Sequence, residues 1–222
     1  PEKGIWHCFG CNEGGDIFKF IMKYEGLDFP TALEMLARRA GVELKPRSGG
    51  DQKAKKAKER LQEVTSLAVR YYQASLVQNK PALEYAVTQR KLTKETLKRF
   101  QIGYAPDDWN ALNHFAVKKD FTAKELKDAG LVGQKAGRTT VYDMFRGRLM
   151  FPICDAQGNP VGFTGRVLSP EQEPKYLNTP QTALYDKSRV IFGLHLAKEA
   201  IRKHDEVVLV EGNMDVVSSH QA

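Results

Sequence analysis

Apolar residues recur every three to four positions along much of the chain, which is the spacing of amphipathic helices. Near the N-terminus this pattern predicts one helix capped by Asp16 and ended by Gly26, and a second running from Pro30 to Gly41. Further helices are predicted at about 55–78, 81–89, 94–100, 122–130 and 193–203. The longest, 55–78, carries its apolar stripe on Leu61, Val64, Ala68, Tyr72 and Leu76.

After Arg146 the pattern changes to short apolar runs bounded by turn residues, which is typical of strands. Residues 148–153 and 161–163 predict two strands joined across 157–159. A further apolar run follows the helix predicted at 193–203, so we expect a buried strand of the parallel type at 206–210. Strands, a helix and another strand, in that order, indicate the beginning of an α/β domain.

These patterns divide the chain into four segments. Residues 1–44 form a small unit, and 45–58 form a linker containing Pro46 and Ser48-Gly49-Gly50. Residues 59–204 form a mixed helical and stranded core, and 205–222 begin a further subdomain. The predicted fold class is therefore α+β.

Composition narrows the class of protein. With 222 residues and 41% hydrophobic content the chain can bury a core, and no apolar run approaches the roughly 20 residues of a membrane span. Position 1 is not Met and no basic-then-apolar leader follows, so we expect no targeting segment; a start at Pro1 is typical of a cut inside a domain. Three cysteines cannot form a disulfide framework, which indicates a reducing compartment such as the cytoplasm.

The net charge of +7 is unevenly distributed. Between Lys45 and Arg60 there are seven basic and two acidic residues. We interpret this run as a solvated linker, with a dedicated nucleic-acid patch as the alternative.

Cys8 and Cys11 have the spacing of one half of a zinc knuckle, because two thiolates on a tight turn can supply two of the four ligands of a Zn²⁺ site. Two buried thiols or a redox Cys-x-x-Cys pair are the alternatives. The glycines around the pair, Gly10 and Gly14-Gly15, favour zinc. The other two ligands would lie upstream of this chain, so we expect it to hold little zinc by itself.

A second group consists of cations placed between apolar strand residues and turns: Arg146, Arg148, Arg166, Lys175 and Lys187. Several cations at strand ends suit a polyphosphate or a nucleic-acid backbone, although ordinary surface cations are the alternative for any one of them. Trp109 lies in a predicted loop, where it can stack on a base or be half-buried packing.

Glu211 directly follows the apolar run 207–210, and Asp215 lies four residues further on. Carboxylates at the end of a buried strand can bind Mg²⁺ and act as a general base toward a hydroxyl. A strand that simply ends in a solvated acid is the alternative, and two-metal phosphoryl transfer needs further acids.

Several strings in one order resemble a single family, the bacterial replicative DNA primases of the DnaG type, over nearly the whole chain. His-Cys-Phe-Gly-Cys at 7–11 with Gly-Gly-Asp at 14–16 resembles the second half of that family's zinc-binding domain. Leu-Thr-Lys-Glu-Thr at 92–96 and Phe-x-Ile-Gly-Tyr-Ala-Pro at 100–106 resemble the start of its RNA polymerase core. The most specific strings are Phe-Arg-Gly-Arg-Leu-Met-Phe-Pro-Ile at 145–153, Gly-Phe-Thr-Gly-Arg at 162–166 and Pro-Lys-Tyr-Leu-Asn-Thr-Pro at 174–180. Val-Glu-Gly-x-Met-Asp-Val at 210–216 resembles the first motif of its Toprim fold.

The resemblance implies roles for these residues. Cys8 and Cys11 would be structural zinc ligands in a zinc-ribbon-type domain that reads the template. Glu211, with Asp215, would belong to the Mg²⁺-dependent catalytic site and assist attack by the primer 3′-hydroxyl or bind metal. The nucleotide and template site would be lined by Arg146, Arg148, Arg166, Lys175, Asn178 and Lys187, with Arg90 and Trp109 beside the single-stranded template groove.

The activity implied is synthesis of short RNA primers from NTPs on single-stranded DNA, by a cytoplasmic monomer that would meet the replicative helicase through a C-terminal domain absent here. Asn213 departs from the Tyr that the family usually has. The upstream zinc ligands and the downstream Asp-x-Asp pair for Mg²⁺ are also absent, so we expect this chain alone to be inactive. A non-catalytic single-stranded-DNA-binding protein and a different Toprim enzyme are the alternatives.

Overall fold

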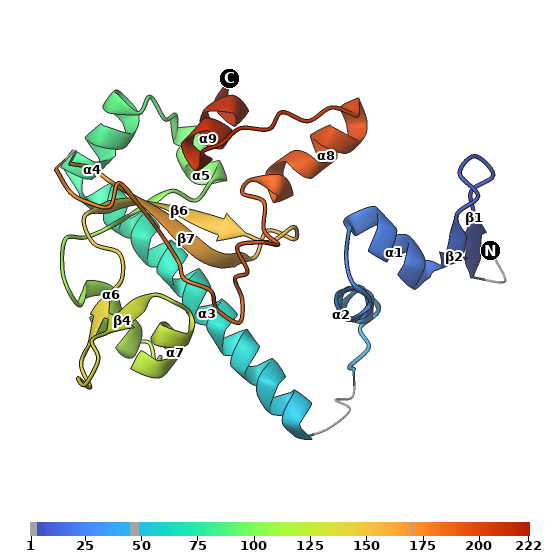
Figure 1. Ribbon diagram of the computed structural model, residues 1–222, viewed down its shortest axis with the longest axis horizontal. Helices are drawn as coiled ribbons and strands as arrows, with labels where there is room; N and C mark the ends of the chain where they lie inside the picture. Colours follow the sequence, from blue (N-terminus) through green and yellow to red (C-terminus); the bar gives the residue numbers. More distant parts are fainter. Residues whose placement is uncertain (1–3, 45–48, 170) are drawn as a thin grey trace. The chain divides into compact units, whose positions relative to one another are not determined.

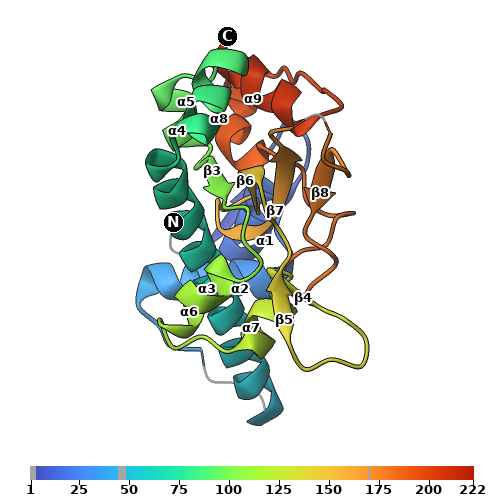
Figure 2. The same ribbon diagram turned by 90° about the vertical axis from the view of Figure 1, so that its left-hand side faces the viewer.

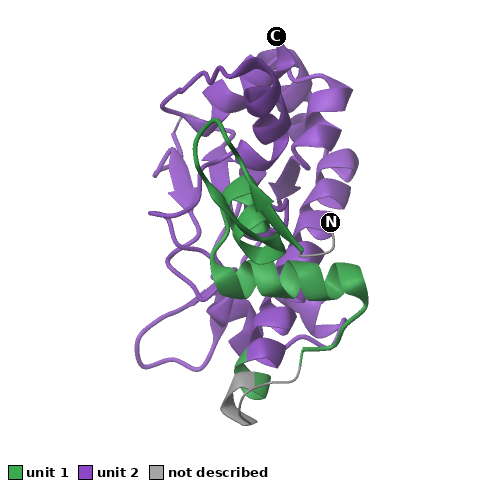
Figure 3. Cartoon of the chain, turned by 90° about the vertical axis from the view of Figure 1, so that its right-hand side faces the viewer, with its two compact units in different colours: residues 1–54 green, residues 55–222 purple. Residues whose placement is uncertain are grey.

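The computed structural model describes residues 4–44, 49–169 and 171–222. The chain divides into two compact units, Pro1–Ala54 and Lys55–Ala222, which Figure 3 distinguishes by colour. Helices and antiparallel strands occur in both, so the predicted α+β class is confirmed.

The first unit contains a small hairpin followed by two helices. β1 (Ile5–His7) pairs antiparallel with β2 (Gly14–Asp16), and α1 (Ile17–Glu25) and α2 (Phe29–Ala40) follow. The Asp16 carboxylate accepts a hydrogen bond from the Lys19 N–H at 2.9 Å, and Gly26 ends α1 in the left-handed conformation with φ 69°. Both ends of this helix therefore lie where the sequence predicts them.

The long helix α3 (Gly49–Gln78) begins earlier than predicted. The segment 45–58 was expected to be a linker, but from Gly49 onward it is helical, whereas 45–48 fall outside the described residues. The physical reason is composition, because the Lys- and Ala-rich stretch 53–58 is made of strong helix formers that charge alone does not unfold.

The second unit is built on a four-stranded sheet. The predicted strands 148–153 and 161–163 are confirmed as a hairpin, and the second continues beyond the prediction, to Val167. All neighbouring strands are antiparallel, in the order β3-β6-β7-β8 (Figure 2). The strands are β3 (Gly103–Ala105), β6 (Arg148–Cys154), β7 (Pro160–Val167) and β8 (Tyr176–Asn178).

Helix α3 covers one face of this sheet (Figure 1). The rings of Tyr72 on α3 and Phe163 on β7 meet edge to face with centroids 5.4 Å apart. Met150 and Phe145 belong to the same buried cluster, so the main core lies between α3 and the sheet.

Shorter elements surround this core. The range 81–89, predicted as one helix, contains two elements. The chain is α-helical only to Glu84 and π-helical from Tyr85. In the described ranges no helix is both long and apolar enough to cross a bilayer. These elements are α4 (Lys80–Glu84), η1 (Tyr85–Gln89), α5 (Lys94–Arg99), α6 (Ala111–Val117), α7 (Ala123–Asp128), β4 (Val132–Gln134), β5 (Val141–Asp143), α8 (Leu194–His204) and α9 (Asn213–Gln221).

The structure does not show the buried strand predicted at 206–210. Val208 and Leu209 are 79% and 81% exposed, and the segment has no strand conformation. A strand needs a hydrogen-bonded neighbour, and no other strand of the described residues pairs with this run. The described sheets are accordingly antiparallel throughout.

Candidate functional site

A cleft of about 810 Å³ opens on the sheet face opposite α3. η1, α5 and α9 cover the β3-β6 side of that face, where Leu149 and Phe151 form a second core, and β7 and β8 are left as the floor of the cleft. The lining residues are Gln89, Arg90, Thr164, Arg166, Lys175, Tyr176, Asn178, Lys187, Glu211, Gly212, Asn213, Met214, Asp215 and Ser218.

Strand register decides which side chains enter this cleft. Thr164 pairs with Asn178, and Arg166 pairs with Tyr176. Because side chains alternate between faces along a strand, these four project from the same face, and Phe163 points to α3 on the other. Two short strands thereby present a compact polar patch.

The cleft collects cations from distant parts of the sequence. Arg90 follows η1, Lys175 precedes β8, and Lys187 lies in the segment before α8. Among the residues that the structure describes, none of these three, nor Arg166, has a carboxylate within ion-pair distance. An unneutralised group of cations in a concave site attracts anions such as phosphates.

Arg166 is the most buried of the cleft cations, with 9% of its surface exposed. Its Nε donates to the Tyr85 hydroxyl at 3.3 Å, and Nη1 donates to the Tyr176 hydroxyl. Burial lowers the pKa of Arg166, but hydrogen bonds to the hydroxyls of Tyr85 and Tyr176 and electrostatic interaction with them outweigh this effect and hold the pKa above its usual value. The guanidinium therefore remains charged despite its burial.

Two acids lie beside these cations. Glu211 and Asp215 are both exposed, in the turn before α9 and in its first turn. Asp215 Oδ2 accepts a hydrogen bond from the Gly212 N–H at 3.2 Å, so this carboxylate also closes the start of α9. Within the described ranges no three or more His, Cys, Asp or Glu residues gather into a metal site. The donors described here do not by themselves fit the Mg²⁺ site that the sequence suggested.

Arg148, one of the cations expected to line the nucleotide and template site, does not line this cleft. It pairs with Val167, one register position from Arg166, and its side chain therefore lies on the opposite face. It is 4% exposed and donates to the Pro174 carbonyl at 2.8 Å and the Gly165 carbonyl at 3.4 Å. Its contact with Pro174 instead anchors the segment that leads to Lys175.

Arg146 and Trp109 lie together outside the cleft lining. The Arg146 guanidinium is 4.0 Å from the centre of the Trp109 ring and 5.6 Å from that of Tyr142. Trp109 is 57% exposed, so its loop position is confirmed. The pair forms a separate aromatic and cationic surface, suited to stacking on a base beside a phosphate.

Asp143, which the sequence analysis did not single out, organises this second surface. Its carboxylate accepts hydrogen bonds from the N–H groups of Leu112 at 2.7 Å and Asn113 at 3.0 Å, and so caps α6 from another element. Its own N–H donates to the Trp109 carbonyl at 2.7 Å, and its carbonyl accepts from Arg146.

Asp143 should also make stability depend on pH. Burial raises its pKa to about 6, against the opposing effect of the two α6 N–H groups. A raised folded-state pKa gives stability that is complete below the unfolded pKa of about 3.9 and is lost as pH rises through about 6. Between pH 4 and pH 7 the free energy of unfolding should therefore fall by roughly 2 kcal/mol relative to Asp143→Asn. Denaturant titrations across this range measure the difference; parallel profiles would contradict it.

Cys8 and Cys11 lie in the turn between β1 and β2, both exposed. Backbone N–H groups of Cys11 and then Gly10, followed by the Cys11 side chain, lower the pKa of Cys8. A lowered thiol pKa favours the thiolate that metals bind. The chemistry of this pair fits two ligands of a zinc site, and His7 Nε2 instead hydrogen bonds to Asn12 Oδ1 at 3.1 Å.

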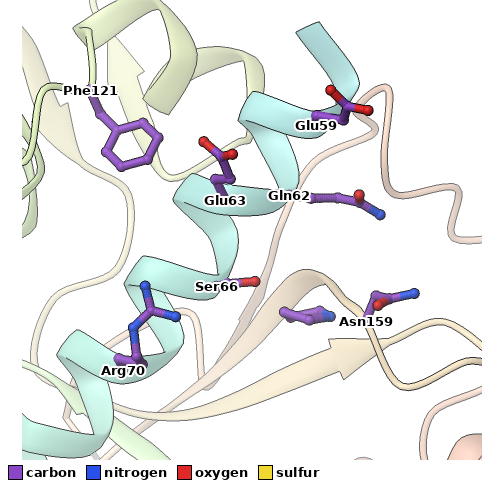
Figure 4. A pocket seen from close by; sticks show the side chains of 8 residues that line it. Glu59, Gln62, Glu63, Ser66, Arg70, Phe121 and Asn159 are labelled. Atoms are coloured by element: carbon purple, nitrogen blue, oxygen red, sulfur yellow. The ribbon is translucent and has the colours of Figure 1, made fainter. Parts of the chain in front are cut away.

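A second hollow of about 560 Å³ lies between α3 and the β6-β7 turn (Figure 4). Glu59 and Glu63 project from α3 on one side, and Asn159 lies across from them. Glu63 is ion-paired with Arg60 at 3.1 Å. This hollow contains none of the residues that the sequence singled out, and we assign it no site.

Tyr85 and Tyr176 hold the Arg166 guanidinium and are not among the residues predicted from the sequence. Tyr176 stands inside the string 174–180, so its position between Lys175 and Asn178 was a usable signal. Tyr85 lies five residues before Arg90, a spacing that brings two side chains onto one face in a π-helical turn but not in an α-helix.

Comparison with known proteins identifies two matching family models. Residues 71–198 match the DNA primase catalytic core, N-terminal domain, and residues 1–52 match the CHC2 zinc finger. A DNA primase of Deinococcus radiodurans is 44% identical over 220 residues, covering 99% of this chain and 37% of the relative.

Solved structures of primase domains are also similar to this one. The zinc-binding and RNA polymerase domains of the Aquifex aeolicus primase match with a TM-score of 0.67 and 31% identity, over 98% of this chain and 51% of theirs. The RNA polymerase domain of Mycobacterium tuberculosis primase DnaG, in complex with a double-stranded DNA oligomer with a 6-nucleotide overhang, matches with a TM-score of 0.68 and 38% identity, over 73% of this chain and 51% of that one. This chain thus spans 37% of the length of its Deinococcus relative and about half of each matched structure.

Proposed function

We propose, from the premise that this chain belongs to the family of bacterial DnaG-type DNA primases, that it forms part of an enzyme that synthesises short RNA primers from NTPs on single-stranded DNA. The primase core model matches 71–198, which includes β7 and β8 of the cleft. Residues 205–222 are proposed as the start of its Toprim region.

The observation that carries the proposal is the cationic wall of the cleft, whose cations form no ion pair with any carboxylate of the described residues. Arg90, Arg166, Lys175 and Lys187 line one site with Glu211 and Asn178. A nucleoside triphosphate brings several negative charges close together, and charge-assisted hydrogen bonds to phosphate are the strong kind. The Asn178 amide and Thr164 hydroxyl add neutral partners for the nucleotide.

Glu211 is proposed as the carboxylate that assists attack by the primer 3′-hydroxyl. Magnesium ions, when bound in such polymerases, neutralise charge on the transferred phosphoryl group. Glu211 and Asp215 do not supply a complete metal site, so catalysis would need acidic residues beyond those described. The expectation that this chain alone is inactive therefore stands as part of the proposal.

The exposed pair of Trp109 and Arg146 is proposed to contact the template. In the Mycobacterium tuberculosis structure the related domain is in complex with a double-stranded DNA oligomer with a 6-nucleotide overhang. A base can stack on Trp109 while Arg146, held over the same ring, meets the neighbouring phosphate.

In the first unit Cys8 and Cys11 are proposed as zinc ligands, in agreement with the CHC2 match. Partnership with a replicative helicase, membership of a primosome, a cytoplasmic location and a monomeric state are proposed for the whole protein from the family alone.

A binding experiment tests the proposal. Residues 1–222 should bind both a fluorescent ATP analogue and a labelled single-stranded oligonucleotide. Each should bind more weakly as salt rises, because salt weakens the attraction between phosphates and cationic side chains. No primer should be made from NTPs and Mg²⁺ by this chain, whereas a full-length protein containing it should make primers. Oligonucleotide binding without ATP binding would favour the non-catalytic alternative. Primer synthesis by residues 1–222 alone would show that the described acids suffice.

A further inference from the structure

The hydroxyl group of Tyr85 connects two cations of the cleft. Arg90 Nε donates to it at 2.8 Å, and Arg166 Nε donates to the same oxygen at 3.3 Å. The hydroxyl donates in turn to the Val167 carbonyl at 3.4 Å. A phenolic hydroxyl can donate and accept at once, and this one does both. Arg90, which follows η1, and Arg166, which lies in β7, are thereby joined through one oxygen atom.

The π-helical turn η1 makes this contact possible. The Arg90 N–H donates to the Tyr85 carbonyl at 3.0 Å, which is a bond between residues five apart. In an α-helix of 3.6 residues per turn, the fifth residue on would point about 140° away. Here the Arg90 guanidinium lies 5.0 Å from the centre of the Tyr85 ring. The irregular turn therefore places both side chains on one face.

Tyr85 holds these arginines without cancelling their charge. Tyr85 is 6% exposed and packs in the core with Leu149 and Phe151, so the hydroxyl has a fixed position. In the described part of the chain no carboxylate forms an ion pair with Arg90 or Arg166. An aspartate or glutamate could orient a guanidinium equally well, but it would remove the positive field that an anion needs.

We propose that Tyr85 is a positioning residue that holds Arg90 and Arg166 as a pair, so that both guanidinium groups bind neighbouring phosphates of one ligand. The inference rests on the proposed function, because it takes the cleft to be a phosphate site. Long arginine side chains lose conformational freedom when they bind, and a partner that orients them beforehand reduces that loss. Affinity then depends on a residue that carries no charge and touches no phosphate.

Binding of a fluorescent ATP analogue to residues 1–222 over a range of salt concentrations tests this. Tyr85→Phe should weaken binding about 5-fold, which corresponds to one hydrogen bond of ordinary strength. The slope of log affinity against log salt should stay unchanged, because both cations remain. Arg90→Ala with Arg166→Ala should lower affinity and slope together. Adding Tyr85→Phe to that pair should change nothing further, because Tyr85 acts only through the arginines.

Tyr104→Phe is the matched control, because Tyr104 is a buried tyrosine of the same core and does not line the cleft. It should bind as the wild type does. If Tyr85→Phe binds the ATP analogue normally while the double arginine variant binds it weakly, the positioning role of Tyr85 is overturned, but the cleft is still supported as a phosphate site. The proposal is also overturned if Tyr85→Phe weakens binding by the same factor when it is added to the double arginine variant as it does in the wild type. If the arginine variants themselves bind normally, the proposed phosphate site fails instead.

Discussion

Lys175→Ala combined with Lys187→Ala should weaken binding of a nucleoside triphosphate about 100-fold at low salt. Both lysines line the cleft, both are exposed, and neither forms an ion pair among the described residues. A hydrogen bond to a charged group contributes about 1.5 kcal/mol or more, so losing two costs about 3 kcal/mol. Fluorescence anisotropy of a labelled ATP analogue with residues 1–222 measures the loss, and the salt dependence should become shallower.

Lys118→Ala combined with Lys119→Ala provides the control. These lysines are exposed and lie outside the cleft lining, and replacing both removes the same net charge as the first pair of substitutions. The control should keep nearly the affinity of the wild type, because neither lysine lines the cleft and so neither is placed to hydrogen bond to a bound phosphate. Equal weakening by the two pairs would mean that general basicity, not the cleft, binds the nucleotide.

The sequence predicted which residues line the cleft better than it predicted the strand register that brings them together. Lys175 and Asn178 stand in one string, and their strand position puts them near the hairpin that carries Arg166. Arg148 belongs to an equally suggestive string, but its face depends on register with β7. A shift of one residue moves a side chain from one face of a sheet to the other, and a single sequence does not specify that register.

Tertiary contacts explain the other differences. The apolar run 207–210 resembles a strand, but a strand forms only where another strand is available to pair with it. Helix α9 follows and was not predicted, because its amphipathic pattern is weak and its position depends on distant contacts. The Gln221 side chain donates to the Lys91 carbonyl at 2.8 Å and accepts from the Thr93 N–H at 2.9 Å. Such contacts fix α9, and with it the acidic side of the cleft, through residues far apart in sequence.

The string 100–106 is better explained by packing than by chemistry, and Gly103 tests this. Gly103 on β3 faces α3, and an added Cβ would lie 2.5 Å from the backbone carbonyl carbon of Tyr72. Atoms cannot approach that closely, and a helix backbone cannot rotate aside as a side chain does. Gly103→Ala should therefore push α3 from the sheet and lower the free energy of unfolding by about 3 kcal/mol. Denaturant titration of residues 1–222 measures this loss.

Gly133→Ala is the matched control in another strand, β4. Its Cβ would meet the tip of the Tyr142 ring at 2.6 Å, a side chain that can turn away. The control should lose less than half as much stability, because only a partly exposed ring has to move. Residual folded Gly103→Ala protein should still bind ATP, since Gly103 does not line the cleft. Full stability of Gly103→Ala would show that β3 and α3 have room between them, and the string 100–106 would then need a functional explanation.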